Sequence, residues 1–420
     1  MIFNEELANG IRVICEPIEQ VRSCAVGVWV GTGSKNELPD EGGISHFIEH
    51  MLFKGTQKRS AQDIAAQMDG IGGTINAFTS KECTCYYAKV LDEHLDIAVD
   101  MLADIVQNSV LAPKEIEKEQ GVICEEILMT QDSPEDLAHE QVASLYYLED
   151  ALAKPILGTE QSVRSFGKEN FQKYMARQYI GQRIVIAVAG NFEKNKLFDM
   201  LREKFAHVKK GELIKDEPNT APGGSRFLGI EKDIEQIHIC MALPGTAMDS
   251  DDQYPLFVLS NALGGSMSSR LFQRIREERG LAYTIYSYPS CYKTAGSFAL
   301  YAGTGEQQAA QVVKLMLEEI DDLKAKGLTK EEFVRSREQL KGSYLLGQEG
   351  TSSRMNALGK TLLLLNREYN EQEAIRRIEA VTQEDIMRVI PKVLDIENLA
   401  TVCVGKLKKQ EKEIRALLGV

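Results

Sequence analysis

Apolar and polar residues alternate along the chain with two different periods, which predicts a succession of strands and helices. A period of two with many β-branched residues is typical of strands, and a period near 3.6 that follows a capping residue is typical of helices. In the first half the pattern predicts, in order, strands at 11–18 and 24–31, helices at 44–55 and 60–72, strands at 73–80 and 84–91, helices at 93–107 and 111–131, further helices up to about residue 180, and a strand at 183–191.

The second half repeats this order of elements. Its pattern predicts strands at 236–245, a helix at 254–263, strands at 282–288 and 297–303, helices at 306–323 and 328–346, and a last strand at 397–405. Aligning Leu111 with Leu328 sets LAPKEIEKEQ against LTKEEFVRSREQ, and both segments lead into a long helix. The chain therefore reads as a tandem duplication of an α+β unit of about 200 residues.

This repeat predicts the domain organisation. We expect two homologous domains of the α+β class at residues 1–208 and 226–420, each with a mixed, largely antiparallel sheet covered by helices. Residues 209–225 between them are polar, carry Pro, Gly and Ser, and show no period, so they are predicted to form a linker.

The segment HFIEH in the first predicted helix has the spacing of a metal site. His46 and His50 are four residues apart, so both imidazoles project from one helix face and can bind one ion. Glu49 shares that face and is placed to accept a proton from water. Such an H-x-x-E-H motif also arises by chance. The neighbouring apolar residues would bury the helix, however, and a buried histidine pair needs partners.

A third ligand should be an acid on another element, because two histidines and one carboxylate leave zinc a position for water. Glu119 and Glu126 lie two helical turns apart on the predicted helix 111–131, so either is a candidate. Spacing alone does not separate Glu125 from Glu126, and any of these acids could instead belong to a solvated face. In the repeat alignment serines replace Glu119 and Glu126, and the second half has nothing like HFIEH. Only the first half is expected to carry the chemistry.

Charge and composition narrow the class of protein. The 420 residues carry a formal net charge of −13, which argues against a nucleic-acid partner and favours attraction of cationic peptides. No apolar run is long enough for a membrane span, and the N-terminus does not resemble a secretory signal. The eight cysteines are scattered without a C-x-x-C pair. The expected location is the bacterial cytoplasm.

HFIEHMLFKGT, followed 76 residues after His50 by the second glutamate of VICEEI, resembles the pitrilysin family (M16) of zinc metallopeptidases. The resemblance covers essentially the whole chain. Its two-repeat length is similar to the M16B subgroup, which includes the mitochondrial processing peptidase β-subunit and bacterial relatives. It implies a clamshell half built from two such domains, one Zn²⁺ per chain, Glu126 as the third ligand and Glu119 as a supporting residue that orients a ligand.

The resemblance also implies residues that handle the substrate. GTINAFTS is similar to the family's edge strand, where Asn76, Ala77 and Phe78 would pair with an extended peptide. SSRLFQRIREERGLAYTIYSY is similar to the segment in which Arg276 and Tyr283 would complete the site from the second domain. Without the resemblance, we would assign the strand to an ordinary hairpin, Arg276 to the surface and Tyr283 to the core.

The predicted function is zinc-dependent endopeptidase cleavage of extended or unfolded peptides, with the water activated by Zn²⁺ and Glu49. A homodimer is expected, because the resemblance implies that four repeats assemble. One alternative is a catalytically silent structural or peptide-binding subunit. Another is the zinc-dependent hydrolysis of a small amide, which would need neither an edge strand nor a second half.

Overall fold

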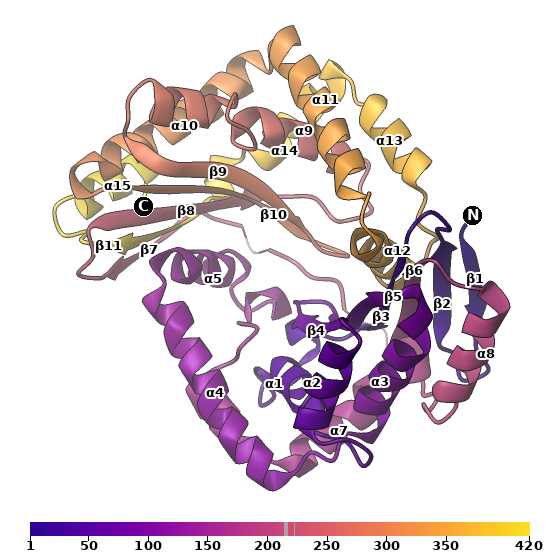
Figure 1. Cartoon of the computed structure of the whole chain (residues 1–420). Coiled ribbons are helices and arrows are strands. Elements are labelled where there is room, and N and C mark those ends of the chain that lie inside the picture. Colours follow the sequence, from indigo (N-terminus) through magenta and orange to yellow (C-terminus); the bar gives the residue numbers. More distant parts are fainter. Residues whose placement is uncertain (214–216, 222) are drawn as a thin grey trace. The chain divides into compact units, whose positions relative to one another are not determined.

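The computed structural model in Figure 1 describes residues 1–213, 217–221 and 223–420. The chain divides into two compact units. Unit 1 comprises Met1–Ile127, Lys154–Glu217 and Leu346–Tyr369, and unit 2 comprises Leu128–Ala153, Pro218–Leu345 and Asn370–Val420. Part of the predicted linker, residues 214–216 and 222, lies outside the described residues.

Unit 1 is built on a six-stranded mixed sheet. Its strands lie in the order β1 (Phe3–Glu6), β2 (Arg12–Pro17), β6 (Ile184–Gly190), β3 (Ser23–Val30), β5 (Thr84–Leu91) and β4 (Thr74–Thr79). The β2–β6 pair is parallel and the other pairs are antiparallel. The central strands β3 and β6 are apolar at almost every position because both faces of the sheet are covered there. Strand β4 is left as an edge.

Helices cover both faces of this sheet. The main contacts with its strands come from α1 (Ile44–Leu52), α2 (Ala61–Gly70), α3 (Leu95–Asn108) and α12 (Thr351–Leu365). Unit 1 also contains α6 (Glu160–Ser165), α7 (Lys168–Gln178), α8 (Lys194–Lys204) and the first part of α4 (Pro113–Asp132), which continues into unit 2. Val26, Val28 and Val30 of β3 belong to the core formed with α1 and α3. Side chains alternate along a strand, so Trp29 points to the other face, where its indole donates to Met355 Sδ of α12 at 3.4 Å.

Unit 2 has a five-stranded sheet of the same design. Its strands lie in the order β7 (Arg226–Glu231), β11 (Ala400–Gly405), β8 (Gln236–Pro244), β10 (Gly296–Gly305) and β9 (Ala282–Cys291). Its helices are α5 (Pro134–Tyr147), α9 (Gln253–Leu263), α10 (Ala309–Lys326), α11 (Lys330–Gly347), α13 (Glu371–Glu379), α14 (Gln383–Val393) and α15 (Glu411–Leu418). One apolar core lies between the sheet and α9, α10 and α14, and a second lies under α5.

The two sheets confirm the predicted duplication and the α+β fold class. The order β7-β11-β8-β10-β9 repeats β2-β6-β3-β5-β4, and the pairs β7–β11 and β2–β6 that begin these two orders are both parallel. In the alignment of Leu111 with Leu328, the first residues of α4 and α11, Pro113 and Lys330, fall opposite each other. The same alignment sets α5 against α12. Strand β1 has no counterpart among the residues of unit 2 that the structure describes.

The compact units differ from two continuous stretches of sequence, because each half of the chain contributes one helix to the other unit. Helix α5 from the first half packs on β8 and β11, and helix α12 from the second half packs on β2, β3 and β6. The predicted domain boundaries at 208 and 226 follow the repeats along the chain and stay a prediction. No helix in the described parts of the chain is both long and apolar enough to cross a membrane.

Candidate metal centre

The helix that carries HFIEH is fixed at its start by a buried carboxylate. Gly43 precedes α1 with a φ of 91°, a conformation that favours glycine. The two oxygens of Glu37 accept the N–H groups of Gly43 and Ser45, each at 2.9 Å. Burial raises the pKa of Glu37 to about 7, although these backbone hydrogen bonds act in the opposite direction. Phe47 and its apolar neighbours on α1 are fully buried, which sets the direction of the opposite face.

On that face the structure brings together His46, His50 and Glu126. The Nε2 atoms of His46 and His50 each lie 3.6 Å from Glu126 Oε2. The three ligand atoms lie within 4.8 Å of one another, and the imidazole centroids are 4.6 Å apart. Glu125 is exposed, so the packing of α4 brings Glu126 rather than Glu125 to the histidines.

The donor set fits a zinc ion. A separation of 3.6 Å is too long for a hydrogen bond but is close to that between two ligands of one tetrahedral zinc, about 3.3–3.5 Å for bonds of about 2.0–2.2 Å. Glu126 Oε2 is buried and has no hydrogen-bond partner among the described residues. Burial, with a smaller contribution from His50, lowers the pKa of His46 to about 3. The ring is therefore neutral, as a metal ligand must be.

Glu49 lies beside these three residues with its carboxylate held from the sheet. Thr79 Oγ1, at the end of β4, donates to Glu49 Oε2 at 2.5 Å. Burial raises the pKa of Glu49, while the hydrogen bond from Thr79 and the nearby His50 lower it. A carboxylate whose pKa is raised by burial binds a proton more readily than one in water, which suits Glu49 to accept a proton.

Glu119 lies beside the Nδ1 atom of His50, and the supporting role that the resemblance implies for it stays a prediction. Its Oε2 lies 3.0 Å from His50 Nδ1, and its Oε1 lies 2.7 Å from Lys54 Nζ. Glu119 is 4% exposed, so its carboxylate depends on these partners.

The predicted substrate residues lie on β4, the edge strand of the unit 1 sheet. Asn76 is exposed, and its Oδ1 accepts the N–H of Ala77 at 2.8 Å. Phe78 packs edge-on against Trp29, with ring centroids 5.5 Å apart. Helix α1 packs beside β4, so the open edge of the strand begins next to Glu49. Whether a peptide binds there stays a prediction.

Arg276 and Tyr283 belong to unit 2. Arg276 lies in a π-helical turn, η5 (Phe272–Glu277), with its guanidinium 4.7 Å from the ring centroid of Tyr283. Tyr283 is 75% exposed, so it is not the core residue that the alternative interpretation expected. The structure thus brings these two side chains together and leaves the phenol accessible. Their predicted role at the metal site stays a prediction.

Three residues of this centre were missed by the sequence reasoning: Glu37, Lys54 and Thr79. Glu37 lies well before the N-cap Gly43, outside the positions from which a side chain usually caps a helix, so it gave no local signal. Lys54 and Thr79 gave no such signal either. They act through contacts with residues that are distant in the sequence, Glu119 and Glu49.

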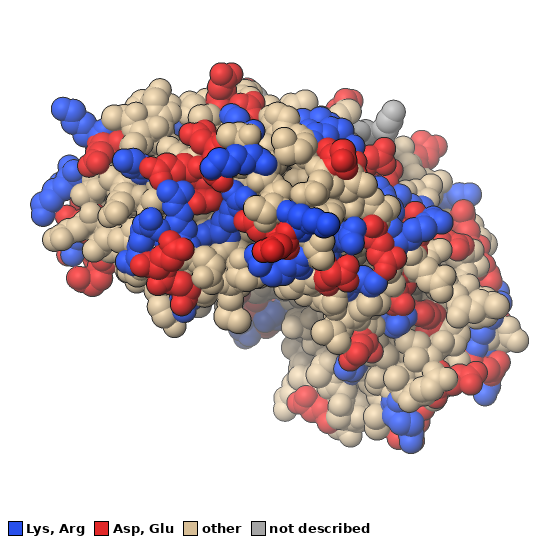
Figure 2. Space-filling view, turned by 90° about the horizontal axis from the view of Figure 1, so that it is seen from above, with Lys and Arg blue, Asp and Glu red and all other residues tan. Residues whose placement is uncertain are grey.

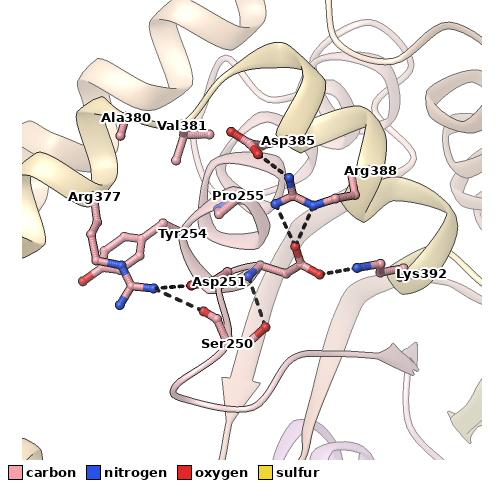
Figure 3. A pocket seen from close by; sticks show the side chains of 11 residues that line it. Ser250, Asp251, Tyr254, Pro255, Arg377, Ala380, Val381, Asp385, Arg388 and Lys392 are labelled. Atoms are coloured by element: carbon pink, nitrogen blue, oxygen red, sulfur yellow. Dashed lines mark hydrogen bonds and ion pairs between the residues drawn. The ribbon is translucent and has the colours of Figure 1, made fainter.

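A separate hollow of about 610 Å³ lies in unit 2, between the start of α9 and helices α13 and α14 (Figure 3). The Arg and Lys side chains that line this hollow already have partners. Asp252 forms ion pairs with Arg388 at 2.9 Å and with Lys392 at 2.6 Å. The guanidinium carbon of Arg377 lies 4.9 Å from the ring centroid of Tyr254. We assign no ligand to it.

Acidic and basic side chains are interspersed over the face seen in Figure 2. That face carries no continuous basic stripe of the kind on which nucleic-acid binding depends. The expectation that the chain does not bind nucleic acid stays a prediction.

Comparison with known proteins gives the class to which this fold and cluster belong. Residues 12–160 match the family described as insulinase (peptidase family M16), and residues 165–340 match the peptidase M16 inactive domain. The chain belongs to peptidase family M16.

Two of its relatives are bacterial proteins. The chain is 44% identical over 389 residues to a Bacillus subtilis protein named as an uncharacterized zinc protease, covering 92% of this chain and 94% of the relative. It is 38% identical over 415 residues to a Streptomyces coelicolor protein with the same kind of name, covering 96% and 90%. A crystal structure of a protease from Helicobacter pylori has a TM-score of 0.90 at 23% identity, covering 96% of this chain and 99% of that one, which shows a shared fold.

Proposed function

We propose that this protein is a zinc-dependent endopeptidase that cleaves extended or unfolded peptides. The observation that carries the proposal is that His46, His50 and Glu126 lie around one point, with Glu49 of α1 bonded to Thr79 at the end of the edge strand β4. The family and the names of its relatives support peptidase chemistry in general. The proposal that the substrates are extended or unfolded peptides rests on the geometry of the site.

Zinc, when bound, would supply a Lewis acid that polarises water and the scissile carbonyl. Glu49 accepts a proton from the attacking water and passes it to the leaving amine. Thr79 holds one oxygen of Glu49 at 2.5 Å, so the other oxygen is the one that handles the proton. Partial burial of Glu49 strengthens its electrostatic interactions with the reacting groups.

An edge strand beside a catalytic base favours extended peptides as substrates. Main-chain hydrogen bonds to β4 would hold a peptide regardless of its side chains. A folded protein cannot offer a free extended segment to that edge. This distinguishes the proposal from hydrolysis of a small amide, which gains nothing from a strand.

We propose that Arg276 holds a substrate carbonyl or terminus and that the exposed phenol of Tyr283 donates a hydrogen bond to the developing oxyanion. We also propose a cytoplasmic homodimer, whose mass in solution light scattering would test the association.

The alternative of a silent structural or peptide-binding subunit is weaker. Such a subunit has no need of the metal ligands, of Glu49 or of the hydrogen bond that holds Glu49. All of these are present in the chain.

The test uses purified protein freed of metal by a chelator. We expect it to cleave a quenched fluorescent basic decapeptide only after zinc is restored, and to cleave a dipeptide more slowly. Zinc binding without hydrolysis of any peptide would favour the silent subunit. Faster cleavage of the dipeptide would favour the small-amide hydrolase.

A further inference from the structure

The carboxylate of Glu119 divides its two oxygens between two different partners. Its Oε2 lies 3.0 Å from His50 Nδ1, and its Oε1 lies 2.7 Å from the ammonium of Lys54. No other hydrogen bond or ion pair of this side chain occurs among the residues that the structure describes. The side chain of Glu119 is 5% exposed, whereas that of Lys54 is 31% exposed.

This arrangement selects one tautomer of His50. An ionised carboxylate can only accept hydrogen bonds, so His50 Nδ1 must carry the proton that it donates to Glu119. In the neutral ring the other nitrogen, Nε2, then has a free lone pair. That nitrogen is the one 3.6 Å from Glu126 Oε2, at the point where the metal would bind.

Lys54 is the group that keeps the carboxylate in this position. A buried carboxylate needs an opposite charge, and Lys54 supplies the ammonium from just beyond the end of α1. His50 on α1 and Lys54 beyond its end both contact Glu119, each through a different oxygen. With both oxygens held, Glu119 has one orientation available.

We propose that Lys54 is a positioning residue: it holds Glu119 so that His50 keeps its proton on Nδ1 and presents Nε2 to a metal. The part of this inference that concerns the metal rests on the proposed function. The part that concerns the tautomer does not, because it describes the metal-free protein.

The first experiment measures the tautomer in metal-free protein with ¹⁵N-labelled histidine. Two-dimensional NMR distinguishes a protonated from an unprotonated ring nitrogen, and the His50→Gln variant assigns the signals. We expect His50 in the unaltered protein to show a protonated Nδ1 and an unprotonated Nε2. A proton on Nε2 in that spectrum would overturn the inference without any variant being needed.

The second experiment changes Lys54. In Lys54→Met the signals of the two ring nitrogens should move toward each other as the tautomers mix, and Lys54→Arg should restore the original pattern. Lys118→Met is the matched control, since Lys118 forms a 2.7 Å ion pair with Glu115 on the exposed side of α4. If Lys54→Met leaves the His50 signals as they are in the unaltered protein, Lys54 does not set the tautomer.

Zinc affinity provides a second measure that needs no turnover. Loss of a group that orients a metal ligand typically costs about 10- to 100-fold in affinity. We expect Lys54→Met to bind zinc about tenfold more weakly in competition with a chromophoric chelator, and Lys118→Met to bind it as before. Unchanged affinity in Lys54→Met would contradict the inference. A protein with the expected tautomer and affinities that hydrolyses no peptide would instead contradict only the proposed function.

Discussion

Substituting Gly359 by alanine tests the exchange of α12 into unit 1. A Cβ added at Gly359 would lie 2.2 Å from Nε1 and 2.6 Å from Cδ1 of Trp29, which is 2% exposed. Alanine in a helix interior normally stabilises by about 1 kcal/mol relative to glycine. Overpacking a well-filled core costs about 1–3 kcal/mol. Because the neighbour is a rigid buried ring, we expect the upper part of this range, about 2–3 kcal/mol, so that Gly359→Ala loses a net of about 1–2 kcal/mol of unfolding free energy.

The assay is thermal unfolding followed by tryptophan fluorescence. Trp29 is the chain's single tryptophan, so the signal reports unit 1 alone. The expected loss corresponds to a fall of about 2–8 °C in the midpoint for a unit of this size. Gly121→Ala in α4 is the matched control: a Cβ there meets nothing within 4 Å, so this variant should gain up to about 1 kcal/mol. Equal stabilisation by both substitutions would show that α12 does not pack on Trp29.

Three further substitutions test the site. Glu126→Gln should weaken zinc binding more than about 100-fold, because loss of a residue that only orients a ligand already costs about 10- to 100-fold in affinity. Glu125→Gln should leave the zinc affinity unchanged. In a chelator competition, weaker binding by Glu125→Gln and unchanged binding by Glu126→Gln would make Glu125 the ligand. Ala77→Pro should lower kcat/KM for a decapeptide about 2- to 10-fold, because it removes one main-chain donor of β4. The unfolding midpoint should stay unchanged, because this N–H donates to the side chain of Asn76 on the same strand. Unaltered kinetics would show that the peptide does not bind along β4. The folded pKa of Glu37 is raised from 4.5 to about 7, so its stabilising contribution is present below pH 4.5 and is lost as the pH rises to about 7, on the order of 1–3 kcal/mol. Urea titrations across this window should show that loss in the unaltered protein and not in Glu37→Gln, and parallel curves would contradict the raised pKa.

Local geometry explains why part of the site could be predicted from the sequence. The spacing of His46, Glu49 and His50 alone predicts that they share a helix face, and in the structure His46 and His50 lie in one cluster with Glu126. The choice between Glu125 and Glu126 was different. Adjacent helix residues point about 100° apart, so the way α4 packs decides whether Glu125 or Glu126 reaches the histidines. The sequence spacing does not predict how α4 packs.

The fold, too, could be predicted from the sequence only in part. Strands β3 and β6 were predicted because buried central strands are apolar throughout. Strands β1 and β7 were missed because they are short and only partly buried, so their sequences show little contrast. The exchange of α5 and α12 also left no local signal. Each has the composition of an ordinary helix, and only the tertiary structure shows which sheet it covers.

The central claim is that His46, His50 and Glu126 hold the metal while Glu49 moves the proton. The most direct measurement compares zinc content and decapeptide turnover in the unaltered protein and in Glu49→Gln. A general base contributes about 10²- to 10⁴-fold to the rate. We therefore predict that Glu49→Gln binds zinc in the same one-to-one ratio and cleaves the peptide at least about 100-fold more slowly. Turnover by Glu49→Gln at the rate of the unaltered protein would contradict the account.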